Sequence, residues 1–325
     1  MESKTKNKKT RAQIAKMVER AFNGVTLAAG DDAVGELKEG WFNVAYDIRL
    51  ADGREVILKI APPAGAEILQ YEKDIMVTEV AAMRMAHQNP RIPVPEIYFA
   101  DEARDICDSL YFFMEKLSGE NLEHVKNTLT PEVKTRVYTQ IGEIIREING
   151  FTGTYFGYEG NSELRAATWK EAFIKIMESV LADGERKKAE YGFSYADVRD
   201  TYLKHVDSLD AITTPCLVHW DAWDSNFFVK DGRISGILDF ERALWAEPLM
   251  EAQFRALFFE GVTDSLRGYG KTEFTPEEQI RCLLYTLHLA LVMNTECYYR
   301  HYDTDEVYNI SMQMIAGAMH GLKAV

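Results

Sequence analysis

The 325-residue sequence contains few cysteines and no arrangement that would pair them. Its four cysteines are scattered, and no two of them form a C-x-x-C pair: Cys107, Cys216, Cys282 and Cys297. Neither a disulfide framework nor a zinc site is therefore indicated. A reducing cytoplasm is the simplest expected setting for such a protein.

Long apolar runs are also missing. The most apolar stretch, residues 283–293, is interrupted by Thr286 and His288 and is too short to span a bilayer, so a core helix is expected there. The N-terminal stretch MESKTKNKKTR is basic and no apolar segment follows it, so no secretory signal is expected. No membrane association is predicted, and residues 1–10 are expected to be a disordered tail.

The sequence also lacks an excess of basic residues. The sequence has 51 acidic and 37 basic residues, and its formal net charge is −14 at pH 7. This balance argues against nucleic acid as a partner, because a nucleic-acid backbone is itself anionic. It would attract a basic small molecule on approach, although solubility alone also accounts for the charge.

A dense set of polar residues stands between residues 217 and 240, in the stretch LVHWDAWDSNFFVKDGRISGILDF. Three short apolar runs within it predict strands: 217–218, 227–229 and 234–238. The Asp-Gly pair at 231–232 predicts a hairpin turn. Asp221, Asn226 and Asp239 would then lie at strand ends and in the loop before the hairpin. Carboxylate and amide oxygens are hard ligands for Mg²⁺, so these positions suit a metal and phosphate site.

The spacing of these polar residues is more specific than their composition. Asp221 precedes Asn226 by five positions, as the catalytic Asp precedes the metal-binding Asn in the kinase loop H-R-D-x-x-x-x-N. Asp239 begins a D-F-E tripeptide where a kinase would place D-F-G. The stretch resembles the catalytic loop of the aminoglycoside phosphotransferase and choline kinase superfamily, whose members keep a kinase-like fold and phosphorylate small molecules. Trp220 in place of the protein-kinase Arg, and Glu241 in place of the Gly, fit the small-molecule kinases better.

Two charged residues upstream extend the resemblance. Residues 44–60 predict two strands around an Asp-Gly turn, and Lys59 on the second strand would contact the α- and β-phosphates. Glu79, on a helix expected at 76–87, would pair with this lysine, with Glu72 as the competing choice. A strand lysine that reaches solvent and a solvated helix glutamate are the ordinary alternatives.

The resemblance also implies where a nucleotide would bind. Gly40 and Asn43 would belong to the loop over the nucleotide, although the sequence has no G-x-G-x-x-G. The apolar stretch 110–117 would be the last strand of the N-terminal lobe, with the backbone of Glu115 and Leu117 at the adenine edge. ATP and GTP both stay open as the phosphate donor, because backbone contacts leave no residue signature.

Beyond residue 122 the pattern is mainly helical. Helices are expected at 131–148, 169–190, 197–209, 248–261, 276–301 and 305–322, in addition to one at 11–22. The expected fold is α+β and protein-kinase-like. Residues 1–117 would form a small N-terminal lobe of antiparallel sheet with one inserted helix. Residues 118–325 would form a larger helical lobe that carries the catalytic loop and the substrate site.

The implied reaction is the transfer of the γ-phosphate of ATP or GTP to a hydroxyl group of a small molecule. Asp221 would accept the proton of that hydroxyl, and His219 would order the loop. Asn226 and Asp239 would hold Mg²⁺, which bridges the nucleotide phosphates.

The sequence leaves the acceptor open. Five residues in or after the motif are candidates for an acidic, aromatic-walled pocket: Trp223, Asp224, Glu241, Trp245 and Glu247. Such a pocket would suit an amine-bearing alcohol, because aromatic faces and carboxylates attract cations. The opposing interpretation is that the tryptophans pack in the core and that the acids are solvated on the surface. A metabolite kinase for choline, an amino alcohol or a sugar, and a pseudokinase that binds nucleotide without catalysis, stay open as alternatives.

Overall fold

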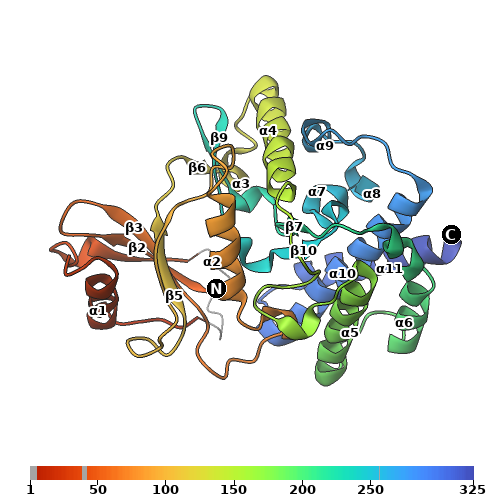
Figure 1. Ribbon diagram of the computed structural model, residues 1–325, viewed down its shortest axis with the longest axis horizontal. Helices are drawn as coiled ribbons and strands as arrows, with labels where there is room; N and C mark the ends of the chain where they lie inside the picture. The colour runs from red at the N-terminus through yellow and green to blue at the C-terminus, as the bar shows by residue number, and fades with distance from the viewer. Residues whose placement is uncertain (1–5, 39–41, 256) are drawn as a thin grey trace. The chain divides into compact units, whose positions relative to one another are not determined.

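The computed structural model of the chain describes residues 6–38, 42–255 and 257–325 (Figure 1). The chain divides into two compact units. The first comprises Met1–Glu67 and Met83–Ser118, and the second comprises Ile68–Ala82 and Gly119–Val325. Residues 68–82, which were predicted to lie in the N-terminal lobe, group with the second unit. Helix α2 (Ile75–Ala86) therefore contributes residues to both units.

The first unit is built on a five-stranded antiparallel sheet in the order β1-β2-β3-β5-β4. Its strands are β1 (Val34–Leu37), β2 (Val44–Arg49), β3 (Glu55–Ile60), β4 (Ile97–Asp101) and β5 (Tyr111–Glu115). Alternate residues of β2 and β3 are buried, and their apolar side chains join those of helix α1 (Arg11–Ala21) in one core. Strand β1 was not predicted, because its two larger apolar residues, Val34 and Leu37, are three positions apart and break the alternation.

The N-terminal tail is held against this unit. Asn7 is buried, and its side-chain amide donates to Asp108 at 3.0 Å. The ammonium group of Lys9 pairs with the same carboxylate at 2.6 Å. The prediction of disorder is therefore wrong for residues 6–10, whereas residues 1–5 lie outside the described part of the chain.

The second unit is mainly helical. Its helices after α2 are α3 (Leu122–Val125), α4 (Pro131–Asn149), α5 (Trp169–Lys187), α6 (Tyr195–Leu203), α7 (Ala252–Arg255), α8 (Leu257–Glu260), α9 (Asp264–Tyr269), α10 (Pro276–Arg300) and α11 (Glu306–Ala324). Helix α4 begins as predicted, with Thr130 as its cap and Pro131 at its first position. The single helix predicted at 248–261 is wrong: a 3₁₀ turn, Pro248–Met250, precedes α7 and α8. Within the described ranges, no helix has the length and apolar character needed to cross a membrane.

Two small sheets in the second unit position the polar loop. Strand β7 (Cys216–Val218) pairs antiparallel with β10 (Leu244–Ala246). Strands β8 (Phe227–Lys230) and β9 (Arg233–Ile237) form the predicted hairpin, and β6 (Glu120–Asn121) adds to β8. At the turn, Asp231 and Gly232 have φ of 53° and 68°, as an Asp-Gly hairpin turn requires. The chain thus enters the polar loop from β7 and leaves it into β8.

Helices α4 and α9 pack so closely that glycine is required between them. A Cβ at Gly142 would overlap the carbonyl oxygen of Ser265, whereas a Cβ at Gly317 in α11 would meet no atom within 4 Å. Gly142→Ala is expected to destabilise the fold by roughly 1–3 kcal/mol, the usual cost of overpacking. Gly317→Ala should stabilise it by about 0.5–1 kcal/mol, because alanine is the better helix former. Urea unfolding of both variants checks this, and equal unfolding midpoints would contradict it.

Candidate functional site

One buried carboxylate, Glu251, holds the backbone of the polar loop. It accepts the backbone N–H groups of His219 at 2.8 Å and Trp220 at 3.0 Å. The side-chain amide of Asn149 also donates to it, at 2.9 Å. Trp220 has a φ of 70°, a strained conformation for a non-glycine residue, and these hydrogen bonds help to hold it. Glu251 therefore fixes the backbone directly before Asp221.

Removal of this carboxylate has a predictable cost. Glu251→Gln is expected to lower the free energy of unfolding by about 2–3 kcal/mol, because an amide group cannot accept from all three donors. Urea unfolding measures the effect, with the exposed Glu143→Gln on α4 as the matched control. Equal midpoints for the two variants would show that the three hydrogen bonds do not support the loop.

The ring of His219 joins the loop to the strand that precedes Asp239. Its Nε2 lies 2.9 Å from the carbonyl oxygen of Leu238, and the ring packs on Phe240 with centroids 4.3 Å apart. Burial lowers the pKa of His219 below its ordinary value. The ring is therefore neutral near pH 7, and Nε2 carries the hydrogen that the carbonyl accepts.

Asp221 is the acid at the centre of the loop. Burial raises the pKa of its carboxyl group, Arg242 acts against this effect and Asp239 acts with it. The Nε of Arg242 lies 3.9 Å from Oδ2 of Asp221, and its guanidinium is held by Glu296 at 2.8 Å. The Asp221 side chain keeps 20% of its surface exposed, so a hydroxyl group from solvent can reach it.

Asn226 and Asp239 lie on either side of the hairpin. The side-chain amide of Asn226 donates to the backbone carbonyl of Asp221 at 2.7 Å, so its donor half is used and its oxygen is the half available to a cation. The backbone N–H of Leu238 donates to the carbonyl of Asn226 at 2.9 Å. Asp239 has a φ of 68°, which aspartate tolerates better than most residues. The hairpin thus brings the three predicted polar residues together.

Asp239 also belongs to a cluster of three carboxylates. Glu79 of α2, Asp239 and Glu241 each offer a carboxylate oxygen within 4.8 Å of the other two. Glu79 and Glu241 are buried. Three carboxylates at such separations repel one another, and a hard divalent cation such as Mg²⁺ would relieve that repulsion. The residues present therefore fit a cation, with Asp239 common to this set and to the predicted pair with Asn226.

The other residues predicted for the acceptor have varied surroundings. Trp223 is exposed, whereas Asp224 accepts from the hydroxyl of Tyr138 at 2.7 Å and pairs with Lys126 at 3.1 Å. Trp245 is buried in strand β10. Asp224 therefore already holds a cation of the chain itself.

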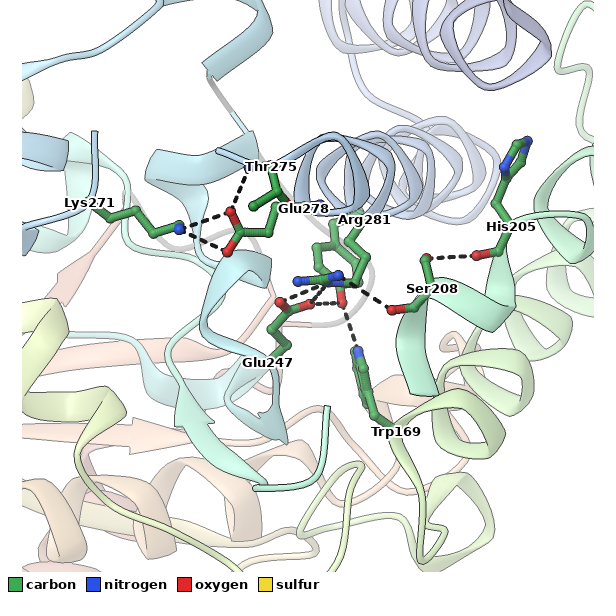
Figure 2. Close-up of polar contacts among 9 residues, drawn as sticks. Trp169, His205, Ser208, Glu247, Lys271, Thr275, Glu278 and Arg281 are labelled. Carbon is green, nitrogen blue, oxygen red and sulfur yellow. Dashed lines mark hydrogen bonds and ion pairs between the residues drawn. The ribbon is translucent and has the colours of Figure 1, made fainter. Parts of the chain in front are cut away.

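Glu247 lies in a buried polar cluster (Figure 2). Its carboxylate pairs with Arg281 of α10 at 2.9 Å and accepts the hydroxyl of Tyr285. That hydroxyl in turn accepts the indole N–H of Trp169 at 2.7 Å. These contacts join the residue after β10 to α5 and α10, so Glu247 supports the packing of the helices.

Four of the residues predicted to contact the nucleotide lie in the first unit: Asn43, Lys59, Glu115 and Leu117. Lys59 is half-buried on β3, and Asn43 is buried directly before β2. Two residues were predicted at the adenine edge. Glu115 is the last residue of strand β5, and Leu117 lies two positions after it. Gly40 lies outside the described residues. Glu79 belongs to the second unit, and its pairing with Lys59 stays a prediction.

A sequence model of the phosphotransferase enzyme family known as APH matches residues 34–273. The chain belongs to this family. The chain is 27% identical over 166 residues to a subtelomeric hrmA-associated cluster protein of Aspergillus fumigatus, across 48% of this chain and 31% of that protein. It is 22% identical over 235 residues to the clavilactone A biosynthesis cluster protein Y of Ampulloclitocybe clavipes, across 61% and 57%. The matches therefore cover less than two thirds of either relative.

Solved structures share the fold of this chain. A Thermobifida fusca protein assigned as a fructosamine-3-kinase superposes with a TM-score of 0.64 at 20% identity, over 96% of this chain and 100% of that one. The aminoglycoside phosphotransferase APH(4)-Ia gives 0.62 at 18% identity, over 97% and 98%. The complex of APH(2″)-IIa with streptomycin and ATP gives 0.60 at 13% identity, over 98% and 97%. The predicted α+β, kinase-like fold is confirmed.

Proposed function

We propose that the chain transfers the γ-phosphate of ATP or GTP to a hydroxyl group of a small molecule, with Asp221 as the base. The observation that carries this proposal is the grouping of Asp221, Asn226 and Asp239 around one hairpin, in a chain of the phosphotransferase family. Phosphoryl transfer depends mainly on the positioning of the reactants and on neutralisation of their charge. Asp221 would position the acceptor hydroxyl, and Asn226 and Asp239 would hold the cation that neutralises the phosphates.

The side chains divide the work. Asp221 accepts the proton of the acceptor hydroxyl, and Arg242 at 3.9 Å favours its ionised form. Glu251 and His219 hold the loop in place. Lys59 contacts the α- and β-phosphates.

The cation and nucleotide sites follow from the same assignment. Asn226 and Asp239, with Glu79 and Glu241 beside Asp239, provide the oxygen ligands for Mg²⁺. The bound cation supplies neutralisation of the phosphate charge. The remaining residues proposed for nucleotide binding are Gly40, Asn43, Glu115 and Leu117.

The proposed acceptor is an amine-bearing alcohol. The net charge of −14 favours the approach of a cation, and the exposed indole of Trp223 offers it an aromatic face. Asp224 and Glu247 contribute less than the sequence suggested, because each already pairs with a cation of the chain.

A panel of hydroxyl compounds tests the proposal. Aminoglycosides, choline, amino alcohols and sugars are each offered with ATP and with GTP, and release of the nucleoside diphosphate is followed. We expect acceptor-dependent release with at least one class, and the class that is phosphorylated distinguishes an aminoglycoside kinase from a metabolite kinase. Nucleotide binding without acceptor-dependent release in any class would instead identify a pseudokinase.

A further inference from the structure

Arg255, the last residue of α7, is a buried cation beside the catalytic loop. The residue is 1% exposed, and its guanidinium carbon lies 4.3 Å from the ring centroid of Trp220 and 5.7 Å from that of Trp223. One Nη group donates to the carbonyl of Trp220. Burial lowers the pKa of Arg255 to about 10, with the nearby acids Asp221 and Glu251 acting in the opposite direction. The guanidinium is therefore charged at neutral pH.

Most of the hydrogen-bonding capacity of this cation is unused. Its Nε and Nη1 have no hydrogen-bond partner among the residues that the structure describes. The side chains of Arg281 and Arg300 are also buried, but they pair with Glu247 and Glu72. A buried guanidinium with unsatisfied N–H groups is costly, so the contrast indicates that a group from outside the chain completes the site.

Two neighbouring side chains are in the same condition. The indole Nε1 of Trp220 and both ring nitrogens of His288 are buried without a partner in the described ranges. His288 packs edge-on against Trp220 with ring centroids 5.9 Å apart. Burial lowers the pKa of His288 to about 3, so the ring is neutral. Buried polar groups in native proteins are paired in roughly nine cases out of ten, so this concentration around one indole points to partners that the described residues do not supply.

We propose that Arg255 and the indole N–H of Trp220 bind a carboxylate of the acceptor substrate. This rests on the proposed phosphotransfer function and narrows the acceptor to hydroxy acids. Guanidinium and indole N–H groups only donate hydrogen bonds, and the planar fork of a guanidinium matches the two oxygens of a carboxylate. Trp220 directly precedes Asp221 in the sequence, and Arg255 donates to the Trp220 carbonyl, so the bound carboxylate would lie close to the base. A hydroxy acid that also carries an amine satisfies this proposal and the amine prediction together.

Trp223 is an exposed side chain beside the Arg255 guanidinium. Its ring lies over the Arg255 guanidinium and is 39% exposed. Binding at Arg255 would therefore change the surroundings of two indoles, Trp220 and Trp223, and tryptophan fluorescence can report it without catalysis.

The binding experiment uses four matched pairs of probes: glycerate and glyceramide, gluconate and sorbitol, galacturonate and galactose, homoserine and homoserine amide. We expect a saturable fluorescence change with at least one acid and a change at least about 10-fold weaker with its neutral partner. Arg255→Gln should weaken binding of that acid by about 10-fold or more. Any of three results would overturn the proposal. These are equal responses to an acid and its neutral partner, no response to any acid, and an unaltered response in Arg255→Gln.

Two further variants separate a lost subsite from a damaged fold. Arg255→Lys keeps the charge without the planar fork and should retain part of the acid preference. Arg267→Gln, in an exposed ion pair on α9, should leave acid binding unchanged. If Arg255→Gln does not fold, the comparison of Arg255→Lys with the wild-type chain decides the matter, and an identical acid preference in both would reject the fork.

Turnover of the same pairs keeps the two proposals distinguishable. In the wild-type chain the acid should have the higher kcat/KM of its pair, and Arg255→Gln should lower that ratio by about 10-fold or more. Phosphorylation of neutral acceptors alone would reject the carboxylate subsite but keep the phosphotransfer function. Acid binding without phosphorylation of any acceptor would keep the carboxylate subsite but reject the phosphotransfer function.

Discussion

Asp221→Asn is expected to lower kcat by about 10²- to 10⁴-fold, the contribution of a positioned general base, and to leave ADP affinity close to that of the wild-type chain. Asparagine keeps the shape of the side chain but cannot accept the proton of the acceptor hydroxyl. The backbone around it would be retained, because Glu251 binds the N–H groups of His219 and Trp220 rather than any group of Asp221. Nucleoside diphosphate release gives kcat, and calorimetric titration with ADP gives the affinity.

The matched control for this variant is Asp231→Asn. Asp231 is exposed at the hairpin turn with a φ of 53°, a conformation that asparagine also adopts. Both kcat and ADP affinity should be unchanged in the control. A full wild-type kcat in Asp221→Asn would remove this residue from the role of base.

Asp239→Asn is expected to lower kcat by about 10²-fold or more and to raise the Mg²⁺ concentration needed for half-maximal activity. Asp239 belongs both to the pair with Asn226 and to the cluster with Glu79 and Glu241. The substitution therefore removes one negative charge from the cation site, whichever of the two sets binds the ion. Steady-state rates over a range of Mg²⁺ concentrations measure the effect. An unchanged Mg²⁺ dependence would exclude Asp239 as a ligand.

Two further variants distinguish the two ligand sets. Asn226→Ala should weaken binding of Mn²⁺, used as a probe in the presence of ADP, if the amide oxygen is a ligand. Glu79→Gln should weaken it if the carboxylate cluster holds the cation. Electron paramagnetic resonance counts free Mn²⁺ directly, so the result does not depend on turnover.

The polar residues of the site were predictable because their chemistry limits the residue type and the strands limit the spacing. Asp221 and Asn226 are five positions apart, and the Asp-Gly turn at 231–232 folds the chain so that Asp239 returns beside them. Ligand chemistry and a short-range turn are both local properties, so one stretch of sequence contains them.

The supporting residues could not be found in this way. Glu251, Arg255 and Glu296 are single charged residues far along the chain from Asp221, and no local pattern separates a buried carboxylate from a solvated one. The same limit explains the wrong helix at 248–261. Glu251 has an extended ψ of 153°, which ends the 3₁₀ turn and places its carboxylate under the loop, whereas an apolar spacing pattern indicates only a continuous helix.

The N-terminal segment shows the same limit at longer range. A lysine-rich stretch predicts a solvated tail, but Asn7 and Lys9 find their partner at Asp108, about a hundred residues along the chain. Only the folded sheet brings these groups together.

Mass spectrometry of the acceptor is the most direct test of the central claim. The wild-type chain and Asp221→Asn are incubated side by side with Mg²⁺, the nucleotide and the acceptor panel, and the phosphorylated product is quantified. A phosphate monoester that forms with the wild-type chain and falls by at least about 10²-fold with Asp221→Asn is the predicted result. Equal product from the two chains, or nucleotide cleavage with no phosphorylated acceptor, would contradict the account.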